Sequence, residues 1–258
     1  MTWYWAMDPT DVLQALRASD RPRLVLWPES GPDARSVALL AGSFDPITVA
    51  HVAMAEAARA VADLVVLVYA VRTLPKEPGT AEPLFTERER VQVAARVCAR
   101  REGMALGLCS HGLLAEQVAA AGERFPAASR SVVLGSDKLI QLFDARWYGD
   151  RDTALGALFG AADVRYAVRG GDHVAGALAE AEALGVADRV RPLEVDPGVA
   201  AVSARAVRVR ARAGGDVGGL VPAEAVAAVR SALLRERRER RAAEVRAPVS
   251  PPEVADPD

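Results

Sequence analysis

The sequence predicts an α/β fold built on a doubly wound parallel sheet, and two observations favour this prediction. First, short apolar runs that suit buried strands alternate with helical patterns along nearly the whole chain of 258 residues. This alternation is typical of strand–helix–strand units in a parallel sheet. Second, polar residues, among them Asp45, Lys76, Asp137 and Arg169, follow the ends of predicted strands. Ligands of such sheets bind at the carboxyl ends of the strands, so the two observations agree.

The elements follow from these patterns in order. Strands are predicted at 23–27, 37–41, 64–69, 104–109, 131–135, 164–168 and 190–195. Helices are predicted at 8–19, 113–121, 154–159 and 172–184, and others are expected to begin at 48, 86, 203 and 222. We expect three parts: an N-terminal extension (1–36), one domain (37–242) and a disordered tail (243–258), because the tail is rich in Pro and Ala.

Bulk properties exclude several classes of protein. The formal net charge of −2 argues against a dedicated nucleic-acid binder, and the basic run at 235–241 has acids interleaved, as a solvated helical face would. No apolar run is long enough for a membrane span. Two cysteines provide neither a disulfide framework nor a zinc motif, so we expect a cytoplasmic protein. The oligomeric state stays open, with a homo-oligomer as one option.

The stretch 42–51 carries the strongest functional signal. Gly42 and an Asp-Pro pair predict a sharp turn after a buried strand, and a helical pattern begins at Thr48. The unpaired N–H groups and the positive dipole end of such a helix form an anion site. Thr48 and His51 lie in its first turn, so we expect the hydroxyl and the imidazole to point at the same anion.

This stretch, GSFDPITVAH, resembles the G-x-F-D-P-x-[HT]-x-G-H signature of the nucleotidyltransferase superfamily, adenylyltransferases in particular. The resemblance implies a Rossmann-like fold of the HIGH superfamily, with His51 and Thr48 as catalytic groups at the phosphates of ATP. The last Gly of the signature is Ala50 here, which adds a methyl group where the backbone should approach phosphates. The resemblance also places three turn residues in the ATP-phosphate site: Gly42, Ser43 and Phe44.

A second match lies at 202–208, VSARAVR, which resembles the superfamily's I-S-S-T-x-x-R signature. Ser203 and Arg208 match, whereas Ala204 and Arg205 replace the second Ser and the Thr. The next loop, with Gly-Gly-Asp-Val and Leu-Val-Pro, also resembles the sequence of this family. Taken alone, the pattern reads more simply as an N-capping Ser and a surface Arg. The resemblance implies instead that Ser203 and Arg208 bind the β- and γ-phosphates, with Arg208 also catalytic, since an Arg fork suits phosphate oxygens.

A third group of matches indicates the acceptor. The segment 135–139, GSDKL, followed by Trp147, resembles the G-x-D-x-L…W segment of nicotinate and nicotinamide mononucleotide adenylyltransferases, in which the Trp stacks on the pyridine ring. A half-buried packing residue is the alternative for Trp147. Pro-Lys at 75–76 and Arg-Gly-Gly at 169–171 are similar to the same branch. The resemblance therefore assigns four residues to the mononucleotide site: Lys76, Asp137, Trp147 and Arg169.

These matches together imply an enzyme that transfers AMP from ATP to nicotinate or nicotinamide mononucleotide and releases pyrophosphate. The attacking phosphate is already an anion, so alignment and charge neutralisation would supply the catalysis. Mg²⁺ is expected on the phosphates of ATP, because the sequence shows no carboxylate cluster for a protein-held metal.

Two alternatives stay open. The Thr-x-x-His form and the Gly-Gly-Asp-Val…Leu-Val-Pro segment resemble phosphopantetheine adenylyltransferase as well, although that family is usually much shorter. The departures at Ala50, Ala204 and Arg205 also allow a non-catalytic nucleotide-binding regulator.

Overall fold

A computed structural model describes residues 8–29, 34–72, 82–169 and 173–246. Its centre is a seven-stranded sheet with the strand order β1-β4-β3-β2-β5-β6-β7. The strands are β1 Leu24–Leu26, β2 Ser36–Ala41, β3 Leu64–Ala70, β4 Met104–Cys109, β5 Ser129–Gly135, β6 Asp163–Ala167 and β7 Val190–Pro192. Every pairing is parallel except that of β1 with β4. The predicted doubly wound α/β fold is therefore confirmed, with one antiparallel strand at its edge.

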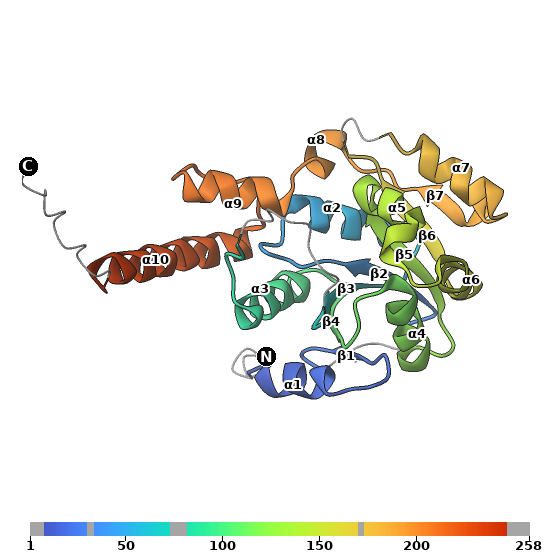
Figure 1. Cartoon of the computed structure of the whole chain (residues 1–258), viewed down its shortest axis with the longest axis horizontal. Helices are drawn as coiled ribbons and strands as arrows, with labels where there is room; N and C mark the ends of the chain where they lie inside the picture. The colour runs from blue at the N-terminus through green and yellow to red at the C-terminus, as the bar shows by residue number, and fades with distance from the viewer. Residues whose placement is uncertain (1–7, 30–33, 73–81, 170–172, 247–258) are drawn as a thin grey trace, which may run out of the picture.

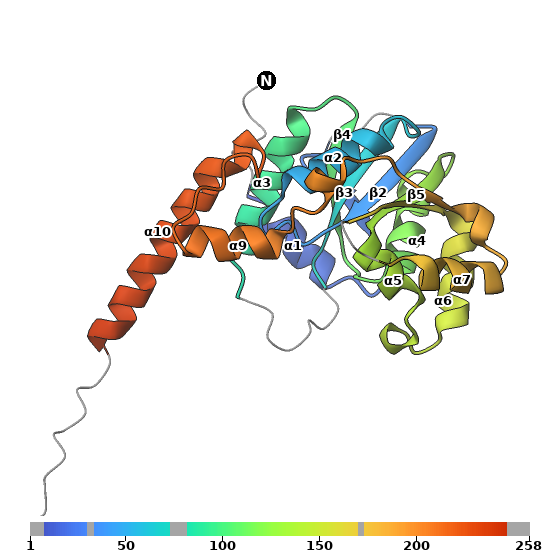
Figure 2. The ribbon, with the colours of Figure 1, turned by 90° about the horizontal axis from the view of Figure 1, so that it is seen from above.

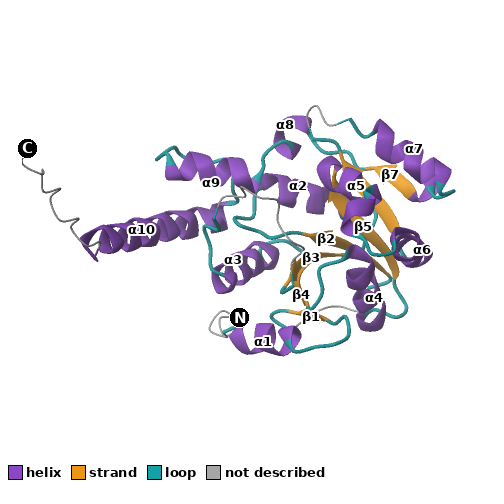
Figure 3. Ribbon diagram, viewed as in Figure 1, coloured by secondary structure: helices purple, strands orange, loops and turns teal. Residues whose placement is uncertain are grey.

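Helices cover both faces of the sheet (Figure 3). The α-helices are α1 Thr10–Arg17, α2 Val49–Ala58, α3 Glu87–Ala99, α4 Leu114–Arg124, α5 Ser136–Phe143, α6 Arg151–Ala161, α7 Ala175–Ala183, α8 Pro197–Ala200, α9 Ala204–Arg212 and α10 Ala223–Arg246, and two short 3₁₀ helices are η2 Ala145–Trp147 and η3 Ala187–Arg189. One apolar core joins α1, α2, α3, α9 and α10 to the sheet, and a second joins α4, α5, α6 and α7 to the opposite face.

The alternation of side chains along β2 explains the two cores. Ala38 and Leu40 belong to the first core, whereas Val37 and Leu39 belong to the second. Successive side chains of a strand point to opposite faces, so a continuous apolar run is what a strand covered on both faces requires.

The direction in which the sheet is built reverses at β2. The chain leaves β2 toward β3 and β4 on one side, then returns to build β5, β6 and β7 on the other. At such a reversal the loops after the two neighbouring strands diverge, and ligands bind outside the carboxyl ends of the strands. The first signature, 42–51, follows β2, and the start of α5, which contains Asp137, follows β5.

The predicted N-terminal extension contributes an edge to this sheet. β1 pairs with β4 over Leu24–Leu26, and α1 buries Leu13 and Leu16 in the first core. At the start of this helix, the Asp8 carboxylate accepts hydrogen bonds from the backbone N–H and the hydroxyl of Thr10.

The C-terminal helix α10 extends from the body of the molecule, beside α9 (Figures 1 and 2). It continues to Arg246, four residues into the segment predicted as a tail, and the rest of that segment lies outside the described residues. Among the described residues, no helix combines the length and the apolar character that crossing a membrane demands.

Candidate active site

The turn after β2 is shaped by close packing. Phe44 has a φ of 46°, in the left-handed region, and its side chain is buried. A Cβ atom at Gly42 would lie 2.6 Å from the ring of Phe44, so the turn requires glycine there. The ring of Phe44 also meets that of His51 edge to face, with the ring centroids 5.4 Å apart. Of the three predicted ATP-phosphate residues in this turn, Ser43 is exposed and Phe44 contributes a packing side chain.

Thr48 caps α2 and orients His51. The backbone N–H of Thr48 donates to Nδ1 of His51 at 3.0 Å, and the Thr48 hydroxyl lies 2.8 Å from the same nitrogen. An N–H group only donates, so Nδ1 must be the unprotonated nitrogen and the neutral ring carries its proton on Nε2. We expected the hydroxyl to point at an anion, but it is buried and lies 3.3 Å from the carbonyl oxygen of Val202. Thr48 is thus a positioning residue for the imidazole.

The charge state of His51 follows from its surroundings. Its ring is half-buried, and desolvation, followed by the positive charge of Arg169, lowers its pKa from 6.5 to about 4. The ring is therefore neutral at pH 7 and offers an Nε2–H donor. The positive charge of Arg169 acts on this ring. An anion bound beside His51 would therefore be attracted by Arg169 and could accept a hydrogen bond from His51.

The two signature segments meet at the start of α2. Besides the contact between Thr48 and Val202, the backbone N–H of Val49 donates to the carbonyl oxygen of Leu220 at 3.1 Å. Ser203 caps α9, with its hydroxyl oxygen accepting from the N–H of Ala206 at 3.1 Å. Ser203 also lines an open groove with a cavity volume of ~610 Å³ along the outer face of α9. The N-cap interpretation of Ser203 is confirmed, and no hydrogen bond donated by its hydroxyl is found among the described residues.

Arg208 is a buried residue and not a surface one. One of its terminal nitrogens donates to the backbone oxygen of Asp45 at 2.6 Å and lies 3.5 Å from the Asp45 carboxylate. Burial lowers the pKa of Arg208, an effect that Asp45 opposes and neighbouring arginines reinforce. Within the described part of the chain, its Nε atom is buried without a hydrogen-bond partner.

Asp45 is a residue whose role the sequence did not reveal. Its carboxylate accepts hydrogen bonds from the N–H groups of Leu84 and Phe85, and Arg90 lies 3.8 Å away. Asp45 thereby links the first signature to the segment before α3 and to Arg208. The only signal for it in the sequence is its place in the signature, because its partners are 39 to 163 residues away along the chain.

The predicted acceptor residues are brought together in part. Arg169, after β6, forms an ion pair with Asp137 at 3.4 Å, and its backbone N–H donates to the hydroxyl of Ser136 at 2.8 Å. A Cβ atom at Gly135 would lie 2.6 Å from Oδ1 of Asp137, so this approach needs glycine. Lys76 lies outside the described residues.

Trp147 lies in η2 and is half-buried. Within the described parts of the chain, no hydrogen bond or ring contact joins it to Asp137 or Arg169, and its indole N–H is buried without a partner. In the same described residues, the Nε atom of Arg169 is also buried and unpartnered, and so are N–H groups of Trp27, Arg130 and Arg165. Unpartnered donors therefore do not by themselves mark a ligand site in this protein.

The arrangement suits an anion better than a protein-held metal. Among the described residues, no group of three or more His, Cys, Asp or Glu side chains is placed to hold a metal ion. Asp45 is engaged by backbone N–H groups and arginines, and Asp137 pairs with Arg169. The side chains that remain near the start of α2 and the end of β6 include an N–H donor on His51 and the cation Arg169, which suit phosphate groups.

Comparisons with known proteins show the family and the fold of this chain. A family model described as cytidylyltransferase-like matches residues 39–176, just over half of the chain. The structure is similar to that of Plasmodium falciparum nicotinic acid mononucleotide adenylyltransferase complexed with APC, with a TM-score of 0.54 and 12% sequence identity over 79% of this chain and 96% of that one. At this identity the likeness shows the fold alone. A search of curated protein sequences gives no significant match.

Proposed function

Because the chain belongs to the cytidylyltransferase-like family, we propose that it is an adenylyltransferase that joins AMP from ATP to nicotinate or nicotinamide mononucleotide. The observation that carries the proposal is the meeting of the two signatures at the start of α2, where Thr48 contacts both His51 and Val202. This contact supports the proposal, because Ser203 follows Val202 directly and Thr48 also contacts the neutral imidazole of His51.

In the proposed reaction, an oxygen of the acceptor's 5′-phosphate forms a bond to the α-phosphorus of ATP. The bond between that phosphorus and the bridging oxygen of pyrophosphate breaks, and pyrophosphate leaves with the bonding electrons. No proton has to be removed from the attacking oxygen, since a phosphate monoester is an anion at neutral pH. Catalysis then rests on alignment and on donors directed at the developing charge.

We assign roles to this chain's residues on that basis. The Nε2–H of His51 donates to an oxygen of the α-phosphate, and Thr48 holds the ring in the tautomer that makes this donation. Ser203 and the first N–H groups of α9 bind the β- and γ-phosphates, and Arg208 adds positive charge from the interior. Gly42 and Ser43 bring the backbone of the turn close to the nucleotide. Mg²⁺ bound to the phosphates of ATP would neutralise part of their negative charge.

The acceptor is proposed to bind across the ends of β5 and β6. Arg169 and Asp137 form an ion pair there, so a bound mononucleotide would meet one cationic and one anionic partner. Lys76 and Trp147 are proposed to complete the site, with the indole stacking on the pyridine ring. The free and buried cysteines, Cys98 and Cys109, suit a reducing compartment, so we propose that the enzyme acts in the cytoplasm.

Phosphopantetheine is the second candidate acceptor. The segment before α10 that resembles the phosphopantetheine branch is seated directly on α2, where Leu220 accepts a hydrogen bond from Val49. Either acceptor would use the same ATP site, so the two proposals differ only at the ends of β5 and β6.

One experiment tests the proposal and separates its alternatives. The full chain is incubated with Mg²⁺-ATP and, in turn, nicotinate mononucleotide, nicotinamide mononucleotide or phosphopantetheine, and pyrophosphate release is measured. Turnover with either pyridine mononucleotide is the expected result. Turnover with phosphopantetheine alone would reassign the acceptor. ATP binding without pyrophosphate release from any acceptor would identify a nucleotide-binding regulator instead.

A further inference from the structure

Positive charge in this chain is concentrated on its last two helices. α9 and α10 together contain eleven arginines and four glutamates, a net charge of +7. The whole chain has a formal net charge of −2, so the remaining residues carry −9. α10 also extends away from the body of the molecule (Figure 1).

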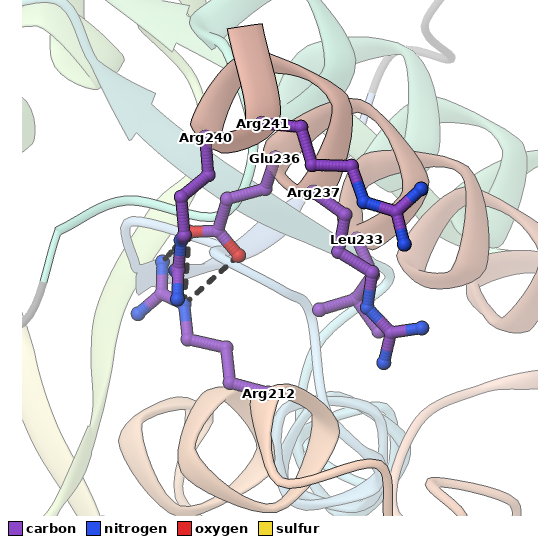
Figure 4. Close-up of a pocket in the computed structure, with 6 residues that line it drawn as sticks. All are labelled: Arg212, Leu233, Glu236, Arg237, Arg240 and Arg241. Carbon is purple, nitrogen blue, oxygen red and sulfur yellow. Dashed lines mark hydrogen bonds and ion pairs between the residues drawn. The ribbon is translucent and has the colours of Figure 1, made fainter. Parts of the chain in front are cut away.

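Part of this charge surrounds a pocket between the end of α9 and the second half of α10. The pocket has a cavity volume of ~270 Å³ and is lined by Arg212, Leu233, Glu236, Arg237, Arg240 and Arg241 (Figure 4). Four guanidinium groups and one carboxylate give the lining a net charge of +3. None of these residues belongs to either signature.

One arginine of the pocket, Arg212, is held in place by an ion pair with a carboxylate and by a hydrogen bond to a backbone oxygen. The Nε of Arg212 donates to the Glu236 carboxylate at 3.0 Å, its Nη2 lies 2.8 Å from the same group, and the Glu82 carbonyl oxygen accepts from it at 3.0 Å. This ion pair fixes the α9 side of the pocket. It also engages Glu236, the only carboxylate among the residues that line the pocket.

The other three arginines are left without a counter-charge. In the described ranges, Arg237, Arg240 and Arg241 make no ion pair, and all three are exposed. Arg237 lies three residues before Arg240 and four before Arg241, so the three project from neighbouring positions of one helix. Like charges at this spacing repel, which destabilises a helix. In Figure 4, Arg237 and Arg241 lie on one side of Leu233, whereas Arg240 reaches toward Arg212 and Glu236 on the other.

We propose that this pocket binds a short polyphosphate chain, either inorganic or the triphosphate end of a nucleotide. Guanidinium forks match phosphate oxygens through paired, charged hydrogen bonds. A diphosphate or triphosphate carries three to four negative charges, close to the charge of the lining, and it would relieve the repulsion among the arginines. The concave shape and small volume favour such a compact anion over a nucleic-acid strand, which would need an extended basic surface. This site does not depend on the proposed reaction.

The test uses the full chain and inorganic tripolyphosphate in isothermal titration calorimetry. The variant Arg237→Gln with Arg241→Gln removes two charges from the pocket. The control, Arg230→Gln with Arg238→Gln, removes two charges from exposed residues of the same helix that do not line the pocket. We expect the pocket variant to weaken tripolyphosphate binding by about tenfold or more, since hydrogen bonds between charged groups are lost, and the control to retain it. Circular dichroism checks that α10 remains helical in both.

Further arms identify the source of the phosphate chain. If ATP loses affinity in the pocket variant as tripolyphosphate does, the pocket accepts nucleotides; if only tripolyphosphate does, it is specific for free polyphosphate, and both results support the proposal. Equal weakening in the two double variants, or no binding at all, would overturn it. The proposal would also be overturned if an oligonucleotide bound more tightly than tripolyphosphate and both variants weakened that binding equally. A dimer of the chain that dissociates in either variant would overturn it as well. Because no acceptor and no turnover are involved, the outcome is independent of the acceptor assay.

Discussion

At the scale of single residues, His51 is the group on which the proposed chemistry depends. Its environment fixes both its tautomer and its charge, because Nδ1 accepts from the backbone of Thr48 and desolvation lowers its pKa to about 4. A neutral donor in this position can stabilise negative charge as it develops on a phosphate without exchanging a proton.

Replacement of His51 tests its role as a donor. We expect His51→Ala to lower kcat by a factor of about a hundred or more, the scale for losing one transition-state donor. His51→Gln keeps an N–H group near the position of Nε2, so its kcat should lie between those of the alanine variant and the wild type. Steady-state pyrophosphate release measures both. Unchanged turnover in His51→Ala would remove this residue from the mechanism.

The depressed pKa of His51 has consequences for pH dependence. The unfolded chain binds a proton on this ring below pH 6.5, whereas the folded chain does so only below about 4. Above pH 6.5, His51 therefore does not lower the free energy of unfolding. As the pH falls from 6.5 toward 4, protonation of His51 in the unfolded chain should lower that free energy. Urea unfolding at a series of pH values should show a smaller decline for His51→Gln than for the wild type.

Nuclear magnetic resonance provides a direct reading of the same pKa. In chain labelled at its three histidines, the resonance absent from His51→Gln should titrate near pH 4. A non-hydrolysable ATP analogue should raise that pKa, because phosphate charge stabilises the protonated ring. A His51 resonance that titrates near 6.5 and ignores the analogue would contradict both the burial and the site.

At the scale of elements, the pair Arg208 and Asp45 links α9 to the turn after β2. We expect Arg208→Ala to raise the KM for ATP and weaken pyrophosphate binding. The substitution also leaves the buried Asp45 with fewer partners, which should lower the free energy of unfolding by roughly 3 kcal/mol. Urea unfolding and ATP kinetics are measured on the same preparation.

Arg208→Lys is the matched control for this pair. It retains a positive charge near Asp45 but not the planar fork, so it should recover part of the stability and less of the pyrophosphate affinity. If Arg208→Ala unfolds at the wild-type urea concentration, the buried pair does not stabilise the link between the two elements.

The elements also show which structural features the sequence reveals. The strands β2 to β4 were predictable because each is largely a continuous apolar run, and β5 because of its apolar second half. The starts of α2, α3 and α9 were predictable because Thr48, Thr86 and Ser203 are typical N-caps. α5 was missed because it begins at Ser136, directly after β5 ends at Gly135, so the polar segment there resembles a loop. α8, of four residues, is too short to produce a period.

Long-range contacts could not be predicted from local patterns. The hydroxyl of Thr48 turns toward Val202, which is 154 residues away, and Arg208 turns inward to Asp45, which is 163 residues away. The signatures identify both residues, but only the folded chain decides whether each side chain faces a ligand or another part of the protein.

At the scale of the whole molecule, the N-terminal segment completes the sheet. Deletion of residues 1–29 would remove α1 and β1, exposing the backbone edge of β4 and the core positions that Leu13 and Leu16 cover. An uncovered strand edge pairs with other chains, so we expect the shortened protein to aggregate. Size-exclusion chromatography and thermal unfolding measure this, with deletion of residues 1–7 as the control that keeps both elements. A shortened chain that is monomeric and equally stable would show that β4 needs no partner.

The contacts from 45–49 to 202–220 also govern when activity can appear during synthesis. A ribosome that has released the first five strands and their helices has not yet delivered the residues that hold the start of α2. The nascent protein can build most of its sheet before the proposed nucleotide site is complete, and that site is completed only as translation nears its end. Truncated products of interrupted translation should therefore be folded in part but unable to compete for ATP.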